Sequence, residues 1–170
     1  MDLHPVAPET LAPEILGVFG RQPPLLTAGD RTHLNTMTIG WCQLGRLWGM
    51  PVCTVYVRPE RYTYQFMEAS DCFTVSVLPK EAGKIIALCG SKSGRDVDKV
   101  KTCGLTVRYG AGDAPFFDEA DWVLVCRKLY AQDLDQACVL EGEKILPHYG
   151  QKGGWHRAYT GQVTEVYARR

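Results

Sequence analysis

Alternation of apolar and polar residues marks the strands of this chain. Residues 34–41 read LNTMTIGW, in which large apolar side chains alternate with small or polar ones at the two-residue period of a β-strand. The run Phe73–Leu78 alternates in the same way, whereas Val52–Val57 is a nearly continuous β-branched apolar run that predicts an interior strand. Three further strands are predicted at Leu105–Tyr109, Trp122–Tyr130 and Ala158–Val166.

Short helices are predicted between these strands. Pro59 suits the first turn of a helix, and the apolar residues after it recur at helical spacing, which predicts a helix over Glu60–Ser70. A second helix is predicted over Lys80–Cys89, and a third, short helix ends at Cys103 with Gly104 as its left-handed cap. Strands of uneven spacing with a few short helices indicate a closed or nearly closed antiparallel barrel with peripheral helices.

Two stretches of the chain lack a regular pattern. Residues 1–30 are rich in proline and glycine and predict an extended N-terminal arm, with a hairpin-like element near Leu25–Thr27. Residues 131–157 are irregular apart from one predicted helical turn near Leu134–Val139. Because domains usually hold roughly 100 to 200 residues, we expect residues 1–170 to form a single domain.

Composition and charge narrow the range of functions. Hydrophobic residues make up 45% of the sequence and charged residues 22%, as in an ordinary globular protein. Lys plus Arg and Asp plus Glu number 19 each, so no positive surplus is present to bind nucleic acid or an anionic membrane surface. Every apolar run is far shorter than the roughly 20 residues that span a bilayer, and no secretion signal is visible. We therefore expect a cytoplasmic protein that binds neither nucleic acid nor membrane.

The cysteines and histidines show no metal-ligand or redox spacing. The seven cysteines are an odd number without a CxxC pair, and most lie in apolar runs. They are interpreted as small buried hydrophobic residues in a reducing compartment, which leaves a single reactive thiol as the alternative. The four histidines are scattered along the chain. No metal site is predicted.

The residues around the first two strands could hold a flavin. Asn35, Thr36, Met37 and Thr38 form a strand edge that can offer amides and hydroxyls to a polar ring rim. Trp41 and Trp48 could add an aromatic wall, although barrel core or a dimer interface is the alternative for both. A helix start rich in donors follows the next strand and predicts an anion site, because first-turn amides lack partners. Its predicted contributors are Arg58, Arg61, Tyr62 and Thr63.

A second predicted anion site lies in the loop that reads SKSGRD. Consecutive loop amides before a helix form an anion-binding nest, and hydroxyls and cations match a phosphate or a ribityl chain. Two such sites exceed the needs of one FMN phosphate, so the second would bind the same FMN from a dimer partner or the phosphates of a nicotinamide cofactor. The alternative is an ordinary helix-starting turn. The predicted contributors are Ser91, Lys92, Ser93, Gly94, Arg95, Asp96 and, one helical turn on, Lys99.

Five strings occur in order along the chain: NTMTIGW, PVCTVYVRPERYTYQF, GSKSGRDVDK followed by CGLT, CRKLYAQDL, and WHRAYTG. Together they resemble the flavin reductase-like, FMN-binding split-barrel family, and in particular its flavoredoxin-like branch. The resemblance implies a mainly β fold, an antiparallel Greek-key split β-barrel with a few peripheral α-helices, working as a homodimer. It also implies that Asn35–Gly40 borders the isoalloxazine, that Val57–Thr63 holds the phosphate, and that Ser91–Lys99 closes over FMN.

The resemblance also implies a function. His156 resembles a histidine that related reductases place beside the flavin for the nicotinamide donor; a surface or structural histidine is the alternative. The resulting prediction is an NAD(P)H-dependent flavin reductase with non-covalent FMN. The alternatives are a flavoredoxin-like carrier reduced by a redox partner protein, an FMN-binding protein without turnover, and a pyridoxamine phosphate oxidase-type enzyme.

Overall fold

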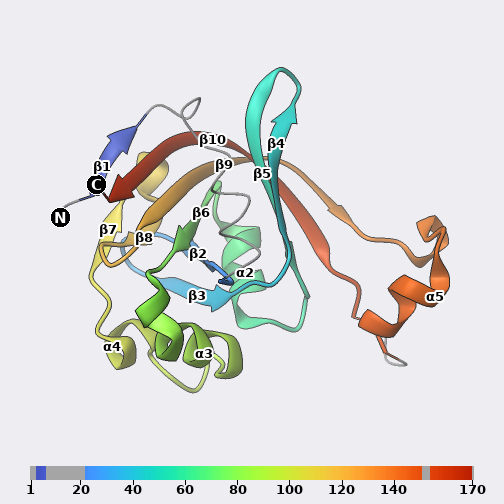
Figure 1. Ribbon diagram of the computed structural model, residues 1–170, viewed down its shortest axis with the longest axis horizontal. Helices are drawn as coiled ribbons and strands as arrows, with labels where there is room; N and C mark the ends of the chain where they lie inside the picture. The colour runs from blue at the N-terminus through green and yellow to red at the C-terminus, as the bar shows by residue number, and fades with distance from the viewer. Residues whose placement is uncertain (1–2, 7–21, 151–153, 170) are drawn as a thin grey trace.

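The fold is a large antiparallel sheet coiled into an open barrel (Figure 1). It is seen in a computed structural model that describes residues 3–6, 22–150 and 154–169. Seven strands follow one another across the sheet in the order β3-β2-β6-β9-β10-β5-β4, and β1 pairs with the far part of β10. The main strands are β1 (Leu3–Val6), β2 (Leu25–Gly29), β3 (Leu34–Thr38), β4 (Cys42–Leu47), β5 (Met50–Val57), β6 (Cys72–Val77), β9 (Trp122–Asp133) and β10 (Arg157–Arg169).

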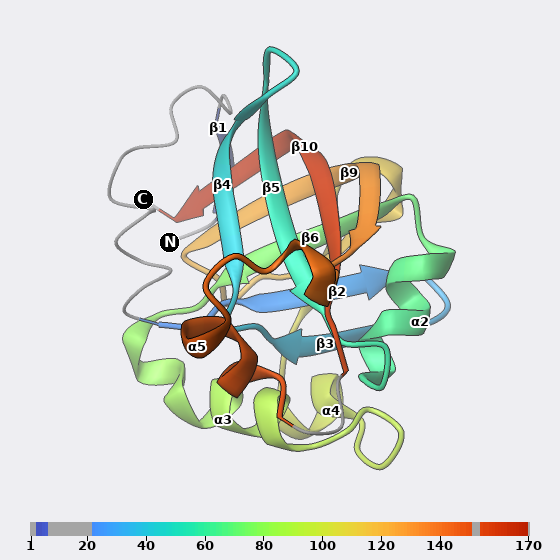
Figure 2. The same cartoon turned by 90° about the vertical axis from the view of Figure 1, so that its right-hand side faces the viewer.

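The sheet does not close on itself. Its two edge strands, β3 and β4, follow each other in the chain but are not hydrogen-bonded neighbours. The three residues between them, Ile39–Trp41, therefore lie where the barrel is split (Figure 2). This opening positions the candidate site described below.

Helices and a small second sheet cover the outside of the barrel. Helix α2 (Tyr62–Ala69) follows β5, and α3 (Gly83–Ser91) and α4 (Lys99–Cys103) lie below β3 in Figure 1. Strands β7 (Val107–Tyr109) and β8 (Pro115–Phe117) pair with each other. Helix α5 (Gly142–Ile145) lies apart from the barrel, beyond the end of β9. The remaining short helices are η2 (Lys80–Ala82), η3 (Ala111–Asp113), η4 (Gln136–Cys138), α5 (Gly142–Ile145) and η5 (Leu146–His148).

Two apolar clusters stabilise this arrangement. The first fills the barrel and includes Leu26, Phe73 and Tyr159, each fully buried. The second lies between the sheet and its outer cover and includes Leu25 and Phe117. Because successive residues of a strand point to opposite faces, Leu25 and Leu26 of β2 serve one cluster each. Burial on both faces explains why so much of the sheet is apolar.

Most predicted elements are present. The strands predicted at Val52–Val57 and Phe73–Leu78 are β5 and β6, the predicted helix at Glu60–Ser70 is α2, and β5 is interior as expected. Gly104 caps α4 with φ 64°, as its position predicted. The strand predicted over Leu34–Trp41 ends at Thr38, because the chain leaves the sheet at the split. The other predicted strands correspond to β7, β9 and β10.

The last part of the predicted N-terminal arm belongs to the sheet. Residues 25–29 belong to β2, which lies between β3 and β6 and pairs with both, so they are interior rather than part of an arm over residues 1–30. Residues 7–21 of the predicted arm lie outside the described part of the chain. The stretch expected to be irregular from residue 131 onward begins as a continuation of β9 to Asp133, followed by η4 within the predicted helical turn.

The hairpin formed by β4 and β5 was not predicted. It projects from the barrel in Figures 1 and 2, and its tight turn gives Trp48 a φ of 51° and Gly49 a φ of 75°. Consecutive positive φ values are typical of the turns that match strand twist, but tryptophan is an uncommon residue there. The described part of the chain holds no helix long and apolar enough to cross a membrane.

Candidate functional site

Three neighbouring cavities lie along β3, from the barrel opening to the start of the strand. The split cavity, about 290 Å³, lies at the barrel opening and is lined by Met37, Thr38, Ile39, Gly40, Trp41, Tyr56, Arg58, Arg61 and His156. The loop cavity, about 180 Å³, lies between the start of α2 and the loop after α3. The outer groove, about 470 Å³, lies beyond that loop. Met37 and Arg61 line both the split cavity and the loop cavity.

One wall of the loop cavity is the start of α2. Arg61 is the N-cap residue in extended conformation, and no side chain caps the helix. The amide of Tyr64 donates to the Arg61 carbonyl, whereas the two helix amides before it, those of Tyr62 and Thr63, precede the first bond of the helix and carry the positive end of its dipole. Thr63 is buried, and its Oγ1 accepts a hydrogen bond of 2.8 Å from Asn35 Nδ2 on β3. This bond fixes the helix start against the strand edge.

The opposite wall is the loop after α3. The carbonyl of Ser93 accepts hydrogen bonds from the amides of Asp96 and Val97, and its Oγ accepts one from the amide of Arg95. The loop touches β3 at Gly94, where an added Cβ would lie 2.0 Å from Asn35 Oδ1 and 2.9 Å from Tyr62 Cδ1. Only glycine permits this approach. The two predicted anion sites are therefore two walls of one cavity rather than separate sites.

Positive charge surrounds the loop cavity. Arg61, Lys92 and Arg95 line it, against the single carboxylate of Glu60. The Arg95 guanidinium lies 4.8 Å from the centre of the Tyr62 ring, within range of a cation–π contact. Helix-start amides and guanidinium groups in one small concavity favour a phosphate group.

Lys99 has a structural role beneath this cavity. Its side chain is buried, and its Nζ donates hydrogen bonds of 2.8 Å to the Thr36 carbonyl and 2.9 Å to the Cys89 carbonyl. Burial lowers the pKa of Lys99. The amine joins α4 to both β3 and α3, so its donors are largely used within the protein.

The hydroxyls of the β3 edge are also used within the protein. Thr36 Oγ1 accepts from Thr27 Oγ1 at 3.0 Å and donates to the Leu26 carbonyl. Thr38 Oγ1 donates to the Ile86 carbonyl at 2.6 Å, although Thr38 still lines the split cavity. Only Asn35, Met37 and Thr38 of this edge reach the split or loop cavities, whereas Thr36 lines the outer groove.

The split cavity has an aromatic wall. The rings of Trp41 and His156 lie 4.4 Å apart between centroids, with His156 carried by the chain just before β10. Tyr149 stacks on Trp155 at 3.9 Å and meets the Trp41 ring edge-on. Trp41 therefore lies in the wall of the split cavity. Trp48 lies instead at the tip of the β4–β5 hairpin, where it contacts Tyr130.

Arg58 lines the split cavity together with Arg61, and only Arg61 of the two also lines the loop cavity. The carbonyl of Arg58 accepts a hydrogen bond from the amide of Arg61. The Arg58 side chain is directed to the chain before β10: its Nη2 donates a hydrogen bond of 2.8 Å to the His148 carbonyl, and its guanidinium lies 5.8 Å from the Tyr149 ring centre. Arg58 therefore links the segment that carries His148 and Tyr149 to the end of β5.

His156 is held in its neutral form. Burial and then the positive charge of Arg58 lower the pKa of His156 from 6.5 to about 4. Its buried Nδ1 has no hydrogen-bond partner among the described residues. A buried polar atom without a partner carries a free-energy cost, and a bound molecule in the split cavity could supply the missing partner.

The remaining predicted site residues divide between cavity and core. Ser91 and Ser93 line the loop cavity, whereas Val57 is fully buried in the barrel and lines none of the three cavities. Cys89 also lines the loop cavity; its thiol is hydrogen-bonded to Cys103, and burial raises its pKa to about 12. The described residues contain no cluster of three or more potential metal ligands. Residues missed from the sequence are Tyr56, Cys89, Gly90, Tyr149 and Trp155.

Tyr149 and Trp155 were missed because they lie in the stretch expected to be irregular. The adjacency of Trp155 to His156 was the available signal, since an aromatic pair beside a predicted site histidine is suited to a ring-binding wall. Tyr56 directly precedes the predicted segment Val57–Thr63, so its omission reflects a boundary rather than a different site.

Comparison with known proteins gives a consistent picture. Residues 16–170 match the family model described as flavin reductase like domain. No curated protein sequence matches the chain. Similar solved structures include flavoredoxin from Methanosarcina acetivorans, with TM-score 0.68, 22% identity, and coverage of 88% of this chain and 69% of that one. At such identities the likeness shows the fold alone.

Two further structures share the fold. One is an FMN-binding domain of a flavin reductases-like enzyme from Shewanella baltica, with TM-score 0.69, 21% identity, and coverage of 99% of this chain and 78% of that one. The other is an FMN-binding protein from Thermus thermophilus with bound p-hydroxybenzaldehyde, with TM-score 0.69, 19% identity, and coverage of 88% and 72%.

Proposed function

The chain belongs to the flavin reductase-like domain family, and on that basis we propose that it binds FMN non-covalently and works as an NAD(P)H-dependent flavin reductase. The observation that carries the proposal is the junction of the loop cavity and the split cavity at Met37 and Arg61. FMN has a phosphate at one end and a flat ring at the other. A small cationic cavity that opens into an aromatic-walled one matches both ends.

Particular residues are assigned to each end of the cofactor. The first-turn amides of α2, Arg61 and Ser93 hold the phosphate, supported by Arg95 at the rim. Asn35, Met37 and Thr38 border the ring, and Trp41 forms part of its aromatic surroundings. Because Asn35 is tied to Thr63, the strand that borders the ring is fixed relative to the helix that holds the phosphate.

The protein supplies position and electrostatics rather than a catalytic triad. FMN itself accepts a hydride and can pass electrons on singly or in pairs. His156 and Arg58 also line the split cavity, and we assign them to the nicotinamide side. A neutral imidazole there can accept or donate a hydrogen bond without placing a second fixed cation beside the two arginines. Holding the donor close to the ring supplies most of the rate.

We also propose that the protein is a homodimer whose partner completes the flavin site. A patch of exposed apolar side chains, here called the hairpin patch, comprises Leu47, Trp48, Leu129 and Tyr130. Trp48 and Tyr130 contact each other, which joins the hairpin tip to β9. Exposed apolar surface of this kind is typical of interaction sites.

The deciding experiment loads the purified protein with FMN, desalts it, and mixes it anaerobically with NADH or NADPH while the oxidised-flavin absorbance is followed. Bleaching by either donor is the expected result. Retained flavin that only dithionite bleaches would support a flavoredoxin-like carrier instead. A protein that retains no flavin absorbance would contradict the whole proposal. His156→Gln is expected to slow bleaching at least tenfold, whereas His4→Gln, on the distant β1, leaves it unchanged.

A further inference from the structure

Cys89 and Cys103, here called the thiol pair, lie in contact beside the loop cavity. Cys89 is buried in α3 and lines that cavity, whereas Cys103 is the last residue of α4 and is only partly buried. Their thiols are hydrogen-bonded to each other, and both side chains belong to the second apolar cluster. Two thiols in contact on neighbouring helices can form a disulfide after a small movement, because the same two sulfur atoms only have to approach to about 2.05 Å.

A second thiol contact, inside the barrel, cannot form such a bond. Cys53 of β5 and Cys126 of β9 are hydrogen-bonded to each other there. Their strands lie on either side of β10, so their backbones are separated by two strand spacings, roughly 9.5 Å. A disulfide requires Cα atoms within roughly 7 Å of each other. The intervening strand therefore keeps these two cysteines reduced.

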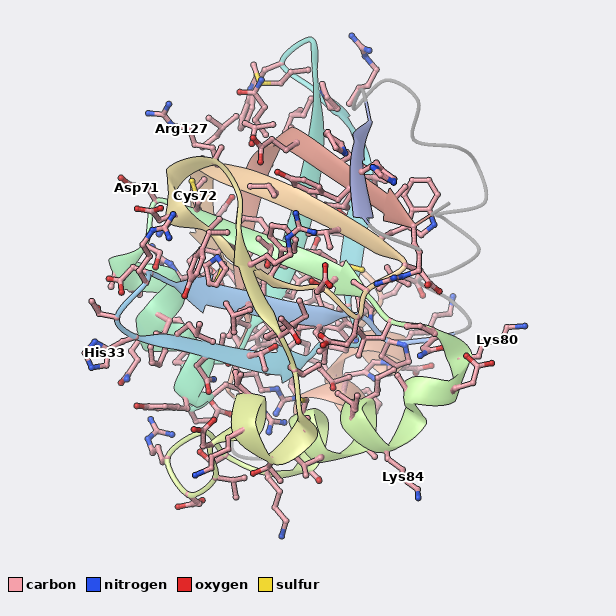
Figure 3. The ribbon with its side chains drawn as sticks, turned by 90° about the vertical axis from the view of Figure 1, so that its left-hand side faces the viewer. His33, Asp71, Cys72, Lys80, Lys84 and Arg127 are labelled. Atoms are coloured by element: carbon pink, nitrogen blue, oxygen red, sulfur yellow. The ribbon has the colours of Figure 1, made fainter. Side chains whose placement is uncertain are left out.

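Cys72 lies away from the thiol pair. Figure 3 shows it beside Arg127, its register partner on β9, on the opposite side of the view from Lys84 of α3. Its sulfur is covered by η3, because a Cβ added at Gly112 would lie 2.8 Å from it. Of these cysteines, the thiol pair is the best placed for a disulfide.

A disulfide in the thiol pair would close the chain around the loop that lines the loop cavity. The residues between α3 and α4, 92–98, are here called the phosphate loop and lie entirely between the two cysteines. Ser93 and Arg95 of this loop line the cavity. One contact already joins the two ends of the loop, since Lys99 Nζ donates to the Cys89 carbonyl at 2.9 Å. A covalent bond would restrict the free loop further, and a loop that is already fixed loses less entropy when it binds a ligand.

The two thiols differ in protonation and access. Burial raises the pKa of the Cys89 thiol, which therefore stays protonated at neutral pH, although the Lys99 ammonium acts in the opposite direction. Cys103 is partly exposed, so a small oxidant reaches its sulfur first. The buried partner is then in place to react with the oxidised sulfur.

We propose that Cys89 and Cys103 are a peroxide-sensitive dithiol whose disulfide locks the phosphate loop and tightens FMN binding. Hydrogen peroxide oxidises the Cys103 thiol to a sulfenic acid and is itself reduced, with release of one water. The Cys89 sulfur then attacks the Cys103 sulfur, and its proton leaves with the sulfenic hydroxyl as a second water. The inference rests on the proposed function for FMN as the ligand and for the source of peroxide, which forms when reduced flavin passes its electrons to oxygen.

The first readout is the disulfide itself. Reduced protein is treated with a small excess of hydrogen peroxide, its remaining thiols are blocked with iodoacetamide, and its tryptic peptides are analysed by mass spectrometry. Cleavage after lysine and arginine places Cys89 in peptide 85–92 and Cys103 in peptide 102–108. The expected product is these two peptides joined by a bond that dithiothreitol cleaves. Cys103→Ser cannot form it, whereas the matched control Cys138→Ser, at an exposed cysteine in η4, forms it as the wild type does.

The second readout is FMN affinity, measured by fluorescence titration before and after peroxide treatment. Oxidation is expected to tighten FMN binding at least threefold in the wild type and in Cys138→Ser, and to leave Cys103→Ser unchanged. Equal FMN affinities of the reduced wild type and Cys103→Ser report that the variant is folded, and Cys103→Ala takes its place if it is not.

Three results would contradict the proposal. Peroxide-treated wild type without the joined peptides, or with another cysteine pair joined, would overturn the dithiol while leaving FMN binding intact. Joined peptides without tighter FMN binding would overturn the lock on the phosphate loop. A protein that forms the disulfide but binds no FMN in either state would overturn the proposed function, and the lock with it.

Discussion

At the scale of single residues, Gly94 shows how the absence of a side chain shapes the site. The loop after α3 can approach β3 only because no Cβ stands between Gly94 and Asn35. That approach brings the predicted anion loop against the α2 start. The sequence indicated a loop with glycine in it, but the reason for the glycine lies in a strand nearly 60 residues earlier.

Substitution of Gly94 by alanine is expected to disrupt the loop cavity. The new Cβ would displace Asn35 or the loop, so FMN affinity should fall at least tenfold and the free energy of unfolding by about 1–2 kcal/mol. Fluorescence titration and urea unfolding measure the two effects. The matched control is Gly83→Ala, since an added Cβ there has no neighbour within 4 Å; a change within about 0.5 kcal/mol or a slight stabilisation is expected. Equal losses of flavin affinity in both variants would refute this role of Gly94.

His156 should be protonated at a lower pH in the folded protein than in the unfolded chain. The unfolded chain binds the proton near pH 6.5, whereas the folded imidazole binds it only near pH 4. The folded state is therefore favoured above pH 6.5, and this contribution is lost as the pH falls from about 6.5 towards 4. A His156 resonance that titrates near pH 4 by NMR is the expected observation.

Substitution of Arg58 distinguishes burial from positive charge as causes of the lowered pKa of His156. Arg58→Gln removes a nearby positive charge and should raise the pKa of His156, although burial, the larger cause, keeps it below 6.5. Arg46→Gln, at the exposed hairpin tip, should leave the pKa unchanged. A His156 pKa that Arg58→Gln fails to raise would show that Arg58 does not act on the imidazole.

At the scale of elements, Lys99 joins parts of the chain that the sequence could not place together. The prediction treated it as a ligand-binding cation, because it follows the anion loop by one helical turn. Its amine instead donates to carbonyls of β3 and α3. Sequence spacing identifies a residue near a site, whereas the direction of a long side chain depends on which carbonyls the fold leaves without partners.

Substitution of Lys99 by methionine tests that structural role. Two buried carbonyls lose their donor, so the free energy of unfolding should fall by about 2 kcal/mol, measured by urea denaturation. Lys101→Met, on the exposed side of α4, should change it by less than about 0.5 kcal/mol. An unchanged stability in Lys99→Met combined with lost FMN affinity would instead identify a ligand-binding lysine.

Interior strands could be predicted from the sequence, whereas edge strands and very short strands could not. Val52–Val57 was recognisable because an interior strand is apolar on both faces. β4 was missed because Cys42–Leu47 is a mostly exposed edge strand whose alternation is interrupted by a Gly-Arg pair, and its turn places a tryptophan at positive φ. β8 has only three residues, which is too few for a period to be read. Such elements exist because neighbouring strands supply hydrogen bonds, a cause that local patterns do not contain.

At the scale of the whole molecule, the open barrel explains why the candidate site residues come from distant segments. The split between β3 and β4 exposes the end of β3. Tyr149, Trp155 and His156 lie in the chain between the long strands β9 and β10, which brings them to that opening. The sequence predicted the antiparallel barrel and most residues of both walls. It could not indicate that two anion-binding stretches share one cavity, because that depends on sheet order.

Assembly is the prediction that belongs to this scale. Leu47→Asp places a charge in the hairpin patch, so a dimeric wild-type protein should become monomeric and lose at least tenfold in FMN affinity, because the partner no longer completes the site. Sedimentation velocity measures the first effect and fluorescence titration the second. Leu140→Asp, at a leucine that is 96% exposed beyond β9, is the control and should change neither. A wild-type monomer that binds FMN tightly would refute the dimeric site.

The contact between Trp41 and His156 has an optical consequence. Tryptophan emission overlaps the absorption of an oxidised flavin, so an indole in the wall of the split cavity transfers its excitation to any flavin bound there. Protonation of the neighbouring imidazole would also quench that indole. The protein thus carries an intrinsic optical reporter, whose brightness records both the occupancy of the cavity and the charge of the histidine in a single unlabelled sample.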